Sequence, residues 1–334
     1  MAAGITLGTY SIDSDWSWRL PSLLQIVPSF LQIAFIWFVP ESPRWLVSKD
    51  RDDEAFEILV KYHAEGDRED SFVLAEFSQI RETIALENEA SKHRWIELVQ
   101  SRANLHRIAI AAFLGFATQW SGNGLVSYYL ARVLKSIGIT STRRQNQINL
   151  GLQCWNLVSG VTGAFLTKLL GRRTQYMIAF AGMTIVYACW TGASANFTQT
   201  ANQTAAGAVV GMIFIYYGFY NLMHPLTWIY IPEIFPFYIR SKGTTITQFT
   251  TRASSAFNTF VNPIGLGHLG WKFYIVYVAW LAIETVIIFF LFVETKGPSL
   301  EELAVLFEGK DAKVGRIHLE SSRKNVDVEE EDRS

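Results

Sequence analysis

The sequence contains little charge and almost no cysteine, and both shortages exclude classes of function. Charged residues make up 18% of the 334 residues, whereas they make up about a quarter of an ordinary soluble domain. The net charge of −1 gives no electrostatic basis for binding nucleic acid. The two cysteines, Cys154 and Cys189, each fall inside an apolar run, which argues against a disulfide framework.

The usual signatures of an enzyme are missing as well. No pair of His or Cys residues has metal-ligand spacing, and the sequence contains neither a glycine-rich phosphate loop nor a G-x-S-x-G elbow. We therefore expect no metal, no other cofactor and no enzymatic activity.

Long apolar runs dominate what is present, because the sequence is 50% hydrophobic and holds 11 Trp and 23 Phe. A helix needs about 20 mainly apolar residues to cross a bilayer. Seven stretches meet this requirement, at roughly residues 19–39, 107–134, 146–168, 174–194, 206–231, 244–266 and 272–293. In lipid the backbone must satisfy its own polar groups, so these stretches are expected to be helices. One run could be a buried core helix, but seven favour an all-α, polytopic membrane bundle.

Lysine and arginine residues mark one side of the predicted membrane helices. They gather after the first stretch, before the second, between the third and fourth, between the fifth and sixth, and after the seventh. The positive-inside rule makes these segments cytoplasmic. Lys135, Arg143 and Arg144 are exceptions, because they lie on the opposite side of the predicted helices. The N-x-T sequons at Asn196 and Asn202 share a loop that is predicted to be extracellular.

The hydropathy pattern predicts an asymmetric layout. The predicted segments are the end of a truncated membrane helix (1–10), one membrane helix (19–39), a cytoplasmic linker with short amphipathic helices (40–105), a six-helix membrane bundle (106–293) and a cytoplasmic tail (294–334). We expect the linker to pack under the bundle, because it is too small for a separate domain core. A transporter with two six-helix halves and a long central loop would give this layout if its first five spans were absent.

Five short motifs, in order, resemble those of the sugar porters of the major facilitator superfamily. They are PESPRWL (40–46), QWSGNGLVSYY (119–129), LLGRR (169–173), PLTWIYIPEIFPFYIR (225–240) and VETKGPSLEEL (293–303). Details such as QWSGN look most like the fungal lactose-permease-like and hexose branches. The resemblance extends to about residue 308 and identifies residues 19–39 as the family's sixth helix.

The resemblance implies a function, and the sequence also departs from the family motifs at several positions. It implies transport of a sugar, a hexose or a disaccharide such as lactose, by alternating access between two bundles, coupled to protons, in the plasma membrane. The expected partners are therefore the sugar, protons and the lipid bilayer. Thr118 stands where the motif has its first Gln, Gly124 where it has an Asn, Lys168 where it has an acid, and His224 where it has a Gly.

Matching to the family motifs also suggests which residues bind substrate. A sugar needs hydrogen bonds to its hydroxyls and an aromatic surface for its C–H face, and buried amides provide the former without the cost of a charge. The candidates are Gln119, Asn123, Tyr128, Asn156, Trp228, Asn258 and Asn262. The alternative for each amide is an interhelical hydrogen bond, worth about 1 kcal/mol.

A second group of charged residues lies at the predicted cytoplasmic helix ends. It comprises Glu41, Arg44, Arg172, Arg173, Glu233, Arg240 and Glu294. The resemblance places them in an ion-pair network that locks the two halves together on the cytoplasmic side. The alternative is that these charges only set the orientation of the helices in the membrane, with the long side chains reaching toward water. Arg252 and Glu284 fall within spans and are functional candidates by default. Similar fungal chains carry an acid near Glu284, which favours a packing role or a structural ion pair there.

Two other membrane functions remain open at this point. A sugar sensor would use the same fold without net flux, and a long signalling tail would favour it, but this tail is short. A seven-span receptor would fit the number of stretches, but such a receptor has no use for porter motifs.

Overall fold

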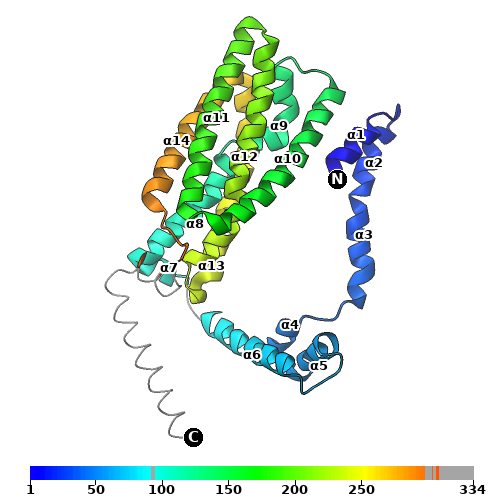
Figure 1. The fold of residues 1–334 in the computed structure, drawn as a ribbon, viewed down its shortest axis with the longest axis vertical. Helices are drawn as coiled ribbons and strands as arrows, with labels where there is room; N and C mark the ends of the chain where they lie inside the picture. Colours follow the sequence, from blue (N-terminus) through cyan, green and yellow to red (C-terminus); the bar gives the residue numbers. More distant parts are fainter. Residues whose placement is uncertain (92–94, 298–302, 304–305, 308–334) are drawn as a thin grey trace. The chain divides into compact units, whose positions relative to one another are not determined.

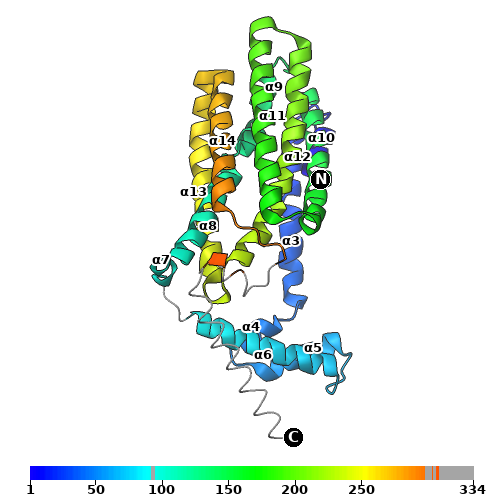
Figure 2. The ribbon, with the colours of Figure 1, turned by 60° about the vertical axis from the view of Figure 1, so that its left-hand side comes forward.

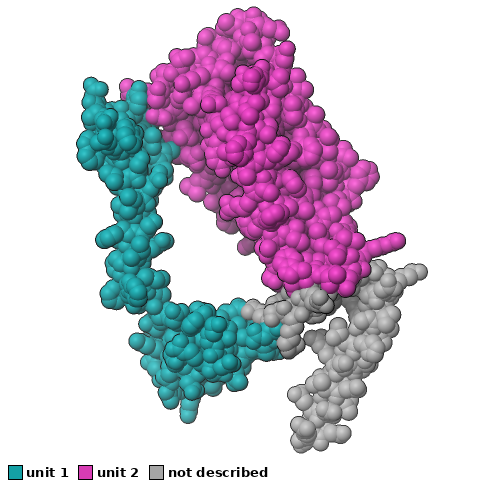
Figure 3. Space-filling view, turned by 180° about the vertical axis from the view of Figure 1, so that it is seen from behind, with its two compact units in different colours: residues 1–94 teal, residues 95–334 magenta. Residues whose placement is uncertain are grey.

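The computed structural model describes the whole chain except residues 92–94, 298–302, 304–305 and 308–334, and the described part is helical without strands. Most of the predicted tail, 294–334, lies outside the described residues. The chain forms two compact units, residues 1–94 and 95–334 (Figure 3).

The first unit begins with an apolar helical stretch. It contains α1 (Ala2–Thr9), α2 (Trp16–Leu24), α3 (Ile26–Phe35) and the 3₁₀ turn η1 (Ile36–Phe38). Residues Trp16–Phe38 are long and apolar enough to cross a membrane, as predicted for 19–39. The stretch is interrupted at Gln25 because Pro28 has no N–H to donate to the carbonyl of Leu24.

The linker folds into three helices, α4 (Pro43–Val47), α5 (Asp52–His63) and α6 (Ser71–Ser91). Two small apolar clusters hold them together. They comprise Leu46, Val47, Ala55 and Ile84, and Leu59, Val60 and Val73. At the start of α5 the Arg51 guanidinium donates to both oxygens of Glu54, at 2.7 and 2.5 Å, and these hydrogen bonds hold the pKa of that carboxyl below its ordinary value.

The second unit is a helical bundle. Its helices are α7 (Glu97–Gln100), α8 (Arg102–Trp120), α9 (Asn123–Ser136), α10 (Thr142–Leu169), α11 (Arg172–Thr200), α12 (Gln203–Ile234), α13 (Phe237–Leu269) and α14 (Phe273–Leu291), with the 3₁₀ turn η2 (Gly270–Lys272) before α14. Helix α12 packs along α10 and α11, α13 packs along α8, and α14 packs along α11 (Figures 1 and 2). Buried tyrosines, phenylalanines and Trp190 fill the interior.

Length and composition identify four stretches of the described chain that could cross a membrane. They are Trp16–Phe38, Arg172–Thr200, Gln203–Ile234 and Ile239–Leu291, the last of which includes most of α13 and all of α14. The predicted stretch 146–168 lies within α10. The prediction of one continuous helix over 107–134 is wrong, because the chain breaks at Ser121 and Gly122 into α8 and α9.

Tertiary contacts stabilise this break. Gly122 has a left-handed φ of 93°, and a Cβ there would lie 2.5 Å from the Tyr187 hydroxyl, so both conformation and space require glycine. The carbonyls of Thr118, Gln119 and Ser121 accept hydrogen bonds from Tyr220, Asn258 and Tyr216, at 3.2, 2.7 and 3.0 Å. Side chains of α12 and α13 therefore replace helical hydrogen bonds that the break removes, as an interrupted helix at membrane depth requires.

Candidate functional site

A cavity of about 260 Å³ lies between α8, α12 and α13. Its wall consists of Thr118 and Gln119 from α8, His224, Thr227, Trp228, Ile231 and Pro232 from α12, and Thr244, Thr247, Gln248, Thr251 and Arg252 from α13. Side chains three or four residues apart share one face of a helix. The spacing of His224 and Trp228, and of Thr244, Gln248 and Arg252, therefore points each set toward the same space.

The hydrogen bonds of the lining residues divide them into two groups. The hydroxyl of each threonine donates to a carbonyl of its own helix; Thr244, for example, donates to Arg240 at 3.0 Å and Thr251 to Thr247 at 2.7 Å. In contrast, the side chains of Gln119, Gln248 and Arg252 make no hydrogen bond within the described part of the chain. These side chains are available to a bound molecule.

Two of the predicted substrate residues, Gln119 and Trp228, line this cavity. Trp228 is 57% exposed, so its ring is accessible. Asn258 lies directly behind the wall, because its amide donates to the carbonyl of Gln119 at 2.7 Å. The other four predicted residues, Asn123, Tyr128, Asn156 and Asn262, are not part of the wall.

These four residues have other surroundings. Asn123 donates to the hydroxyl of Tyr220 at 3.1 Å, Asn156 accepts from Asn221 at 3.0 Å, and Asn262 accepts from Tyr277 at 2.5 Å. The three amides thus make the interhelical hydrogen bonds considered as their alternative role. Tyr128 is exposed. Their contact with substrate stays a prediction.

His224 and Gln248 line the cavity, but sequence reasoning did not place them at the site. In the sequence, His224 was notable only because the family motif has a glycine at this position. In the structure, the centroid of its ring lies 5.8 Å from that of Tyr220. The signal that could have found them is spacing. His224 precedes Trp228 by one turn, and Gln248 precedes Arg252 by one turn.

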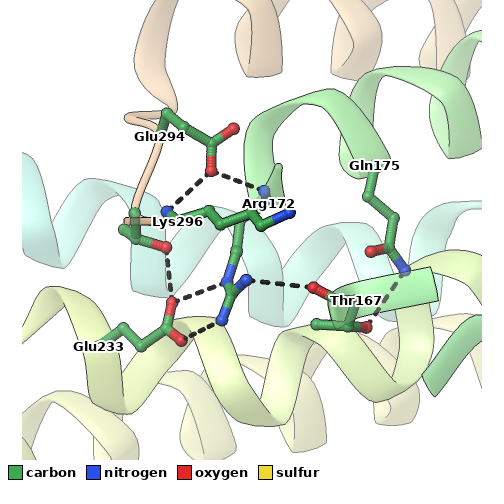
Figure 4. Close-up of polar contacts among 7 residues, drawn as sticks. Thr167, Arg172, Gln175, Glu233, Glu294 and Lys296 are labelled. Carbon is green, nitrogen blue, oxygen red and sulfur yellow. Dashed lines mark hydrogen bonds and ion pairs between the residues drawn. The ribbon is translucent and has the colours of Figure 1, made fainter. Parts of the chain in front are cut away.

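A polar cluster occupies the start of α11 (Figure 4). The Arg172 guanidinium donates to both carboxylate oxygens of Glu233 on α12, at 2.9 and 3.3 Å, and to the carbonyl of Thr167 at 3.1 Å. The hydroxyl of Thr295 donates to Glu233 at 2.5 Å. Although Lys168 stands where the family motif has an acid, Arg172 finds its carboxylate on another helix.

Glu294 caps α11. Its carboxylate accepts the backbone N–H groups of Arg172 and Arg173, at 2.7 and 3.2 Å, where the helix dipole favours negative charge. A Cβ at Gly171 would lie 2.2 Å from a Glu294 oxygen, so a larger residue there would displace the carboxylate from this position. The segment after α14 is thereby fastened to α11. Lys296 reinforces it by donating to the carbonyl of Leu169 at 2.8 Å.

The structure therefore brings together four of the seven charged residues predicted for the cytoplasmic network: Arg172, Arg173, Glu233 and Glu294. Arg173 also donates to the carbonyl of Phe289 at 2.5 Å. Arg240 donates to the carbonyl of Phe235 at 3.4 Å.

Glu41 and Arg44 belong to the first unit, where they contribute to the wall of a separate cavity of about 600 Å³. No group of three or more His, Cys, Asp or Glu side chains that could hold a metal occurs among the described residues.

Glu284 on α14 is fully buried, and neither of its carboxylate oxygens has a hydrogen-bond partner among the described residues. Of the two roles expected at this position, a packing role or a structural ion pair, the described residues show no ion pair. We expect Glu284→Gln to leave the free energy of unfolding unchanged or to raise it by about 1 kcal/mol, because the amide keeps the shape of the side chain and cannot ionise in this buried position. Chemical denaturation in detergent would measure this. A loss of more than about 2 kcal/mol would show that the carboxylate does have a stabilising partner.

Comparison with known proteins agrees with these features. A family model described as "Sugar (and other) transporter" matches residues 1–307. The chain is 30% identical, over 90% of its length, to the MFS-type transporter criB of Aspergillus cristatus, of which it spans 61%. It is also 30% identical, over 92% of its length, to the sugar transporter STL1 of Saccharomyces cerevisiae, of which it spans 53%. The chain thus spans little more than half the length of these curated relatives.

Solved structures show the same fold. The inward-open structure of the xylose transporter XylE from E. coli superposes with a TM-score of 0.68 at 21% identity, covering 91% of this chain and 61% of that one. The relatives are transporters, so the expectation that the chain is not an enzyme is confirmed. On this evidence the chain is a multi-pass membrane protein that belongs to the sugar transporter family of the major facilitator superfamily.

Proposed function

We propose that this chain takes part in moving a sugar, a hexose or a disaccharide, across the plasma membrane by alternating access, coupled to protons. The observation that carries the proposal is the cavity in which Gln119 and Trp228 meet. The indole face suits the C–H surface of a pyranose, and the free amide suits its hydroxyls. Relatives named as a glucose transporter, a sugar transporter and a hexose transporter support a sugar as substrate.

The cluster at the start of α11 suits a cytoplasmic closure. Arg172 and Glu233 are partly buried, with side-chain exposures of 16% and 23%. Because the net stabilisation of such an ion pair is small, the contact can form and break during a transport cycle. Glu41, Arg44 and Arg240 belong to this closure in our proposal. The simpler role of the same residues is to set the orientation of the helices in the membrane. Mutation distinguishes the two roles, because loss of a closure contact alters sugar flux but not the orientation of the helices.

The substitution Trp228→Ala tests the sugar site. We expect binding of a labelled hexose to weaken about tenfold, because the sugar loses its aromatic surface, worth about 1.4 kcal/mol. Binding is measured by equilibrium dialysis on the detergent-solubilised chain, and uptake is measured in proteoliposomes with and without an inward proton gradient. Trp37→Ala is the matched control, because Trp37 is exposed and lies in the first unit.

Three results would count against parts of this proposal. Equal binding by the wild type and Trp228→Ala would contradict the placement of Trp228 at the sugar. Binding without uptake in any condition would favour a sensor. Uptake that ignores the proton gradient would indicate facilitated diffusion.

A further inference from the structure

A positive charge lines the cavity, and the described residues place no negative charge in its wall. Arg252 comes from α13, and none of the residues that form the cavity wall is an Asp or a Glu. Within the described part of the chain, Arg252 makes no hydrogen bond and no ion pair. Arg252 is exposed, so its guanidinium is accessible to a molecule that enters the cavity, and an ionisable residue within a membrane helix is a candidate functional group by default.

Two acids of the second unit, Glu233 and Glu284, are not part of the cavity wall. Glu233 follows the cavity residue Pro232, but its carboxylate is bound by Arg172 and Thr295. Glu284 is fully buried on α14 and is not part of the wall. The guanidinium of Arg252 is therefore left for a molecule that enters the cavity.

The other free groups fit a sugar that carries this negative charge. Gln119 and Gln248 each offer an amide for hydroxyls, and the exposed ring of Trp228 offers a surface for a pyranose. Arginine presents its donors in a planar fork that matches a carboxylate in a bidentate manner. His224 adds a ring nitrogen to the same wall.

We propose that the preferred substrate of this cavity is a cyclic sugar acid, a hexuronate, whose ring lies on Trp228 and whose carboxylate binds Arg252. This rests on the proposed function, because it assumes that the cavity takes a sugar. A sugar phosphate fits less well, because the single arginine of the wall leaves the second charge of the phosphate without a matching cation.

D-glucuronate and D-glucose are the matched probes, because they differ only in having a carboxylate or a hydroxymethyl group at C6. Equilibrium dialysis on the detergent-solubilised chain gives the Kd of each. We expect D-glucuronate to bind about tenfold more tightly than D-glucose, and D-glucose 6-phosphate to bind more weakly than D-glucuronate. Arg252→Gln should bring the ratio of the two Kd values close to one, whereas Arg252→Lys should keep part of the preference. Arg144→Gln, at an exposed arginine outside the cavity, should keep all of it.

The outcomes distinguish failure of the sugar-acid proposal from failure of the proposed sugar site. If D-glucose binds as tightly as D-glucuronate to the wild type, the sugar-acid proposal is overturned and the sugar site stands. If neither binds, both proposals are overturned. If Arg252→Gln leaves the preference intact, or lowers the melting temperature of the ligand-free chain by several degrees, Arg252 serves the fold and not the substrate, and the proposal again fails.

Discussion

Replacing Gly163 with valine is expected to lower the free energy of unfolding of the chain by about 3 kcal/mol. A Cβ at this position of α10 would lie 2.3 Å from the carbonyl oxygen of Asn221 and 3.3 Å from the Cα of Leu222. The obstacle is the backbone of α12, so no change of rotamer relieves it. Close approach of backbones at a small residue is a typical way for membrane helices to pack, because lipid leaves them no hydrophobic driving force.

Gly160→Val, one turn earlier on the same helix, is the matched control. Nothing lies within 4 Å of a Cβ built there, so its effect should stay within about 0.5 kcal/mol. Denaturation of both variants in the same detergent gives the comparison. Equal losses for the two variants would mean that the contact between α10 and α12 does not limit stability. A loss confined to Gly163→Val should also weaken sugar binding, because α12 carries Trp228.

Apolar length allowed the sequence to predict where long helices lie, but it could not predict where a helix is interrupted. The bilayer imposes one simple requirement, which any run of about 20 apolar residues meets. The break at Gly122 depends on Tyr216, Tyr220 and Asn258, which come from helices far along the chain. The two glycines of Ser121-Gly-Asn-Gly124 were the only local sign of this break.

The site was predicted in the same partial way. Motif matching selected Gln119 and Trp228, which line one cavity, but it treated each motif separately and so missed that Gln248 and Arg252 lie opposite them. Likewise, charge at helix ends predicted a polar cluster. The pairing of Arg172 with Glu233, and the capping of α11 by Glu294, depend on how the helices pack. The sequence indicates which polar side chains are present and at which helix ends they lie. Which of them pair across helices depends on the tertiary structure.

Glu233→Ala is expected to lower the free energy of unfolding by about 2 kcal/mol. The Arg172 guanidinium is only 16% exposed, and after the substitution the Thr167 carbonyl is its remaining acceptor among the described residues. The substitution also removes the acceptor of the Thr295 hydroxyl. Most of the loss comes from this uncompensated charge. The double variant Arg172→Met, Glu233→Leu should therefore recover part of the stability, since it leaves no lone charge.

The ion pair between Arg19 and Asp15 provides the control for this effect. It joins the same types of group at 3.2 Å, but its side chains are 49% and 71% exposed, so Asp15→Ala should cost less than about 0.5 kcal/mol. Salt separates the two pairs further, because 1 M NaCl screens exposed charges far more than partly buried ones. If Glu233→Ala costs no more than Asp15→Ala, the cluster at the start of α11 does not stabilise the bundle. The Arg172 guanidinium would then not be left uncompensated by the loss of Glu233, and the argument from its burial would fail.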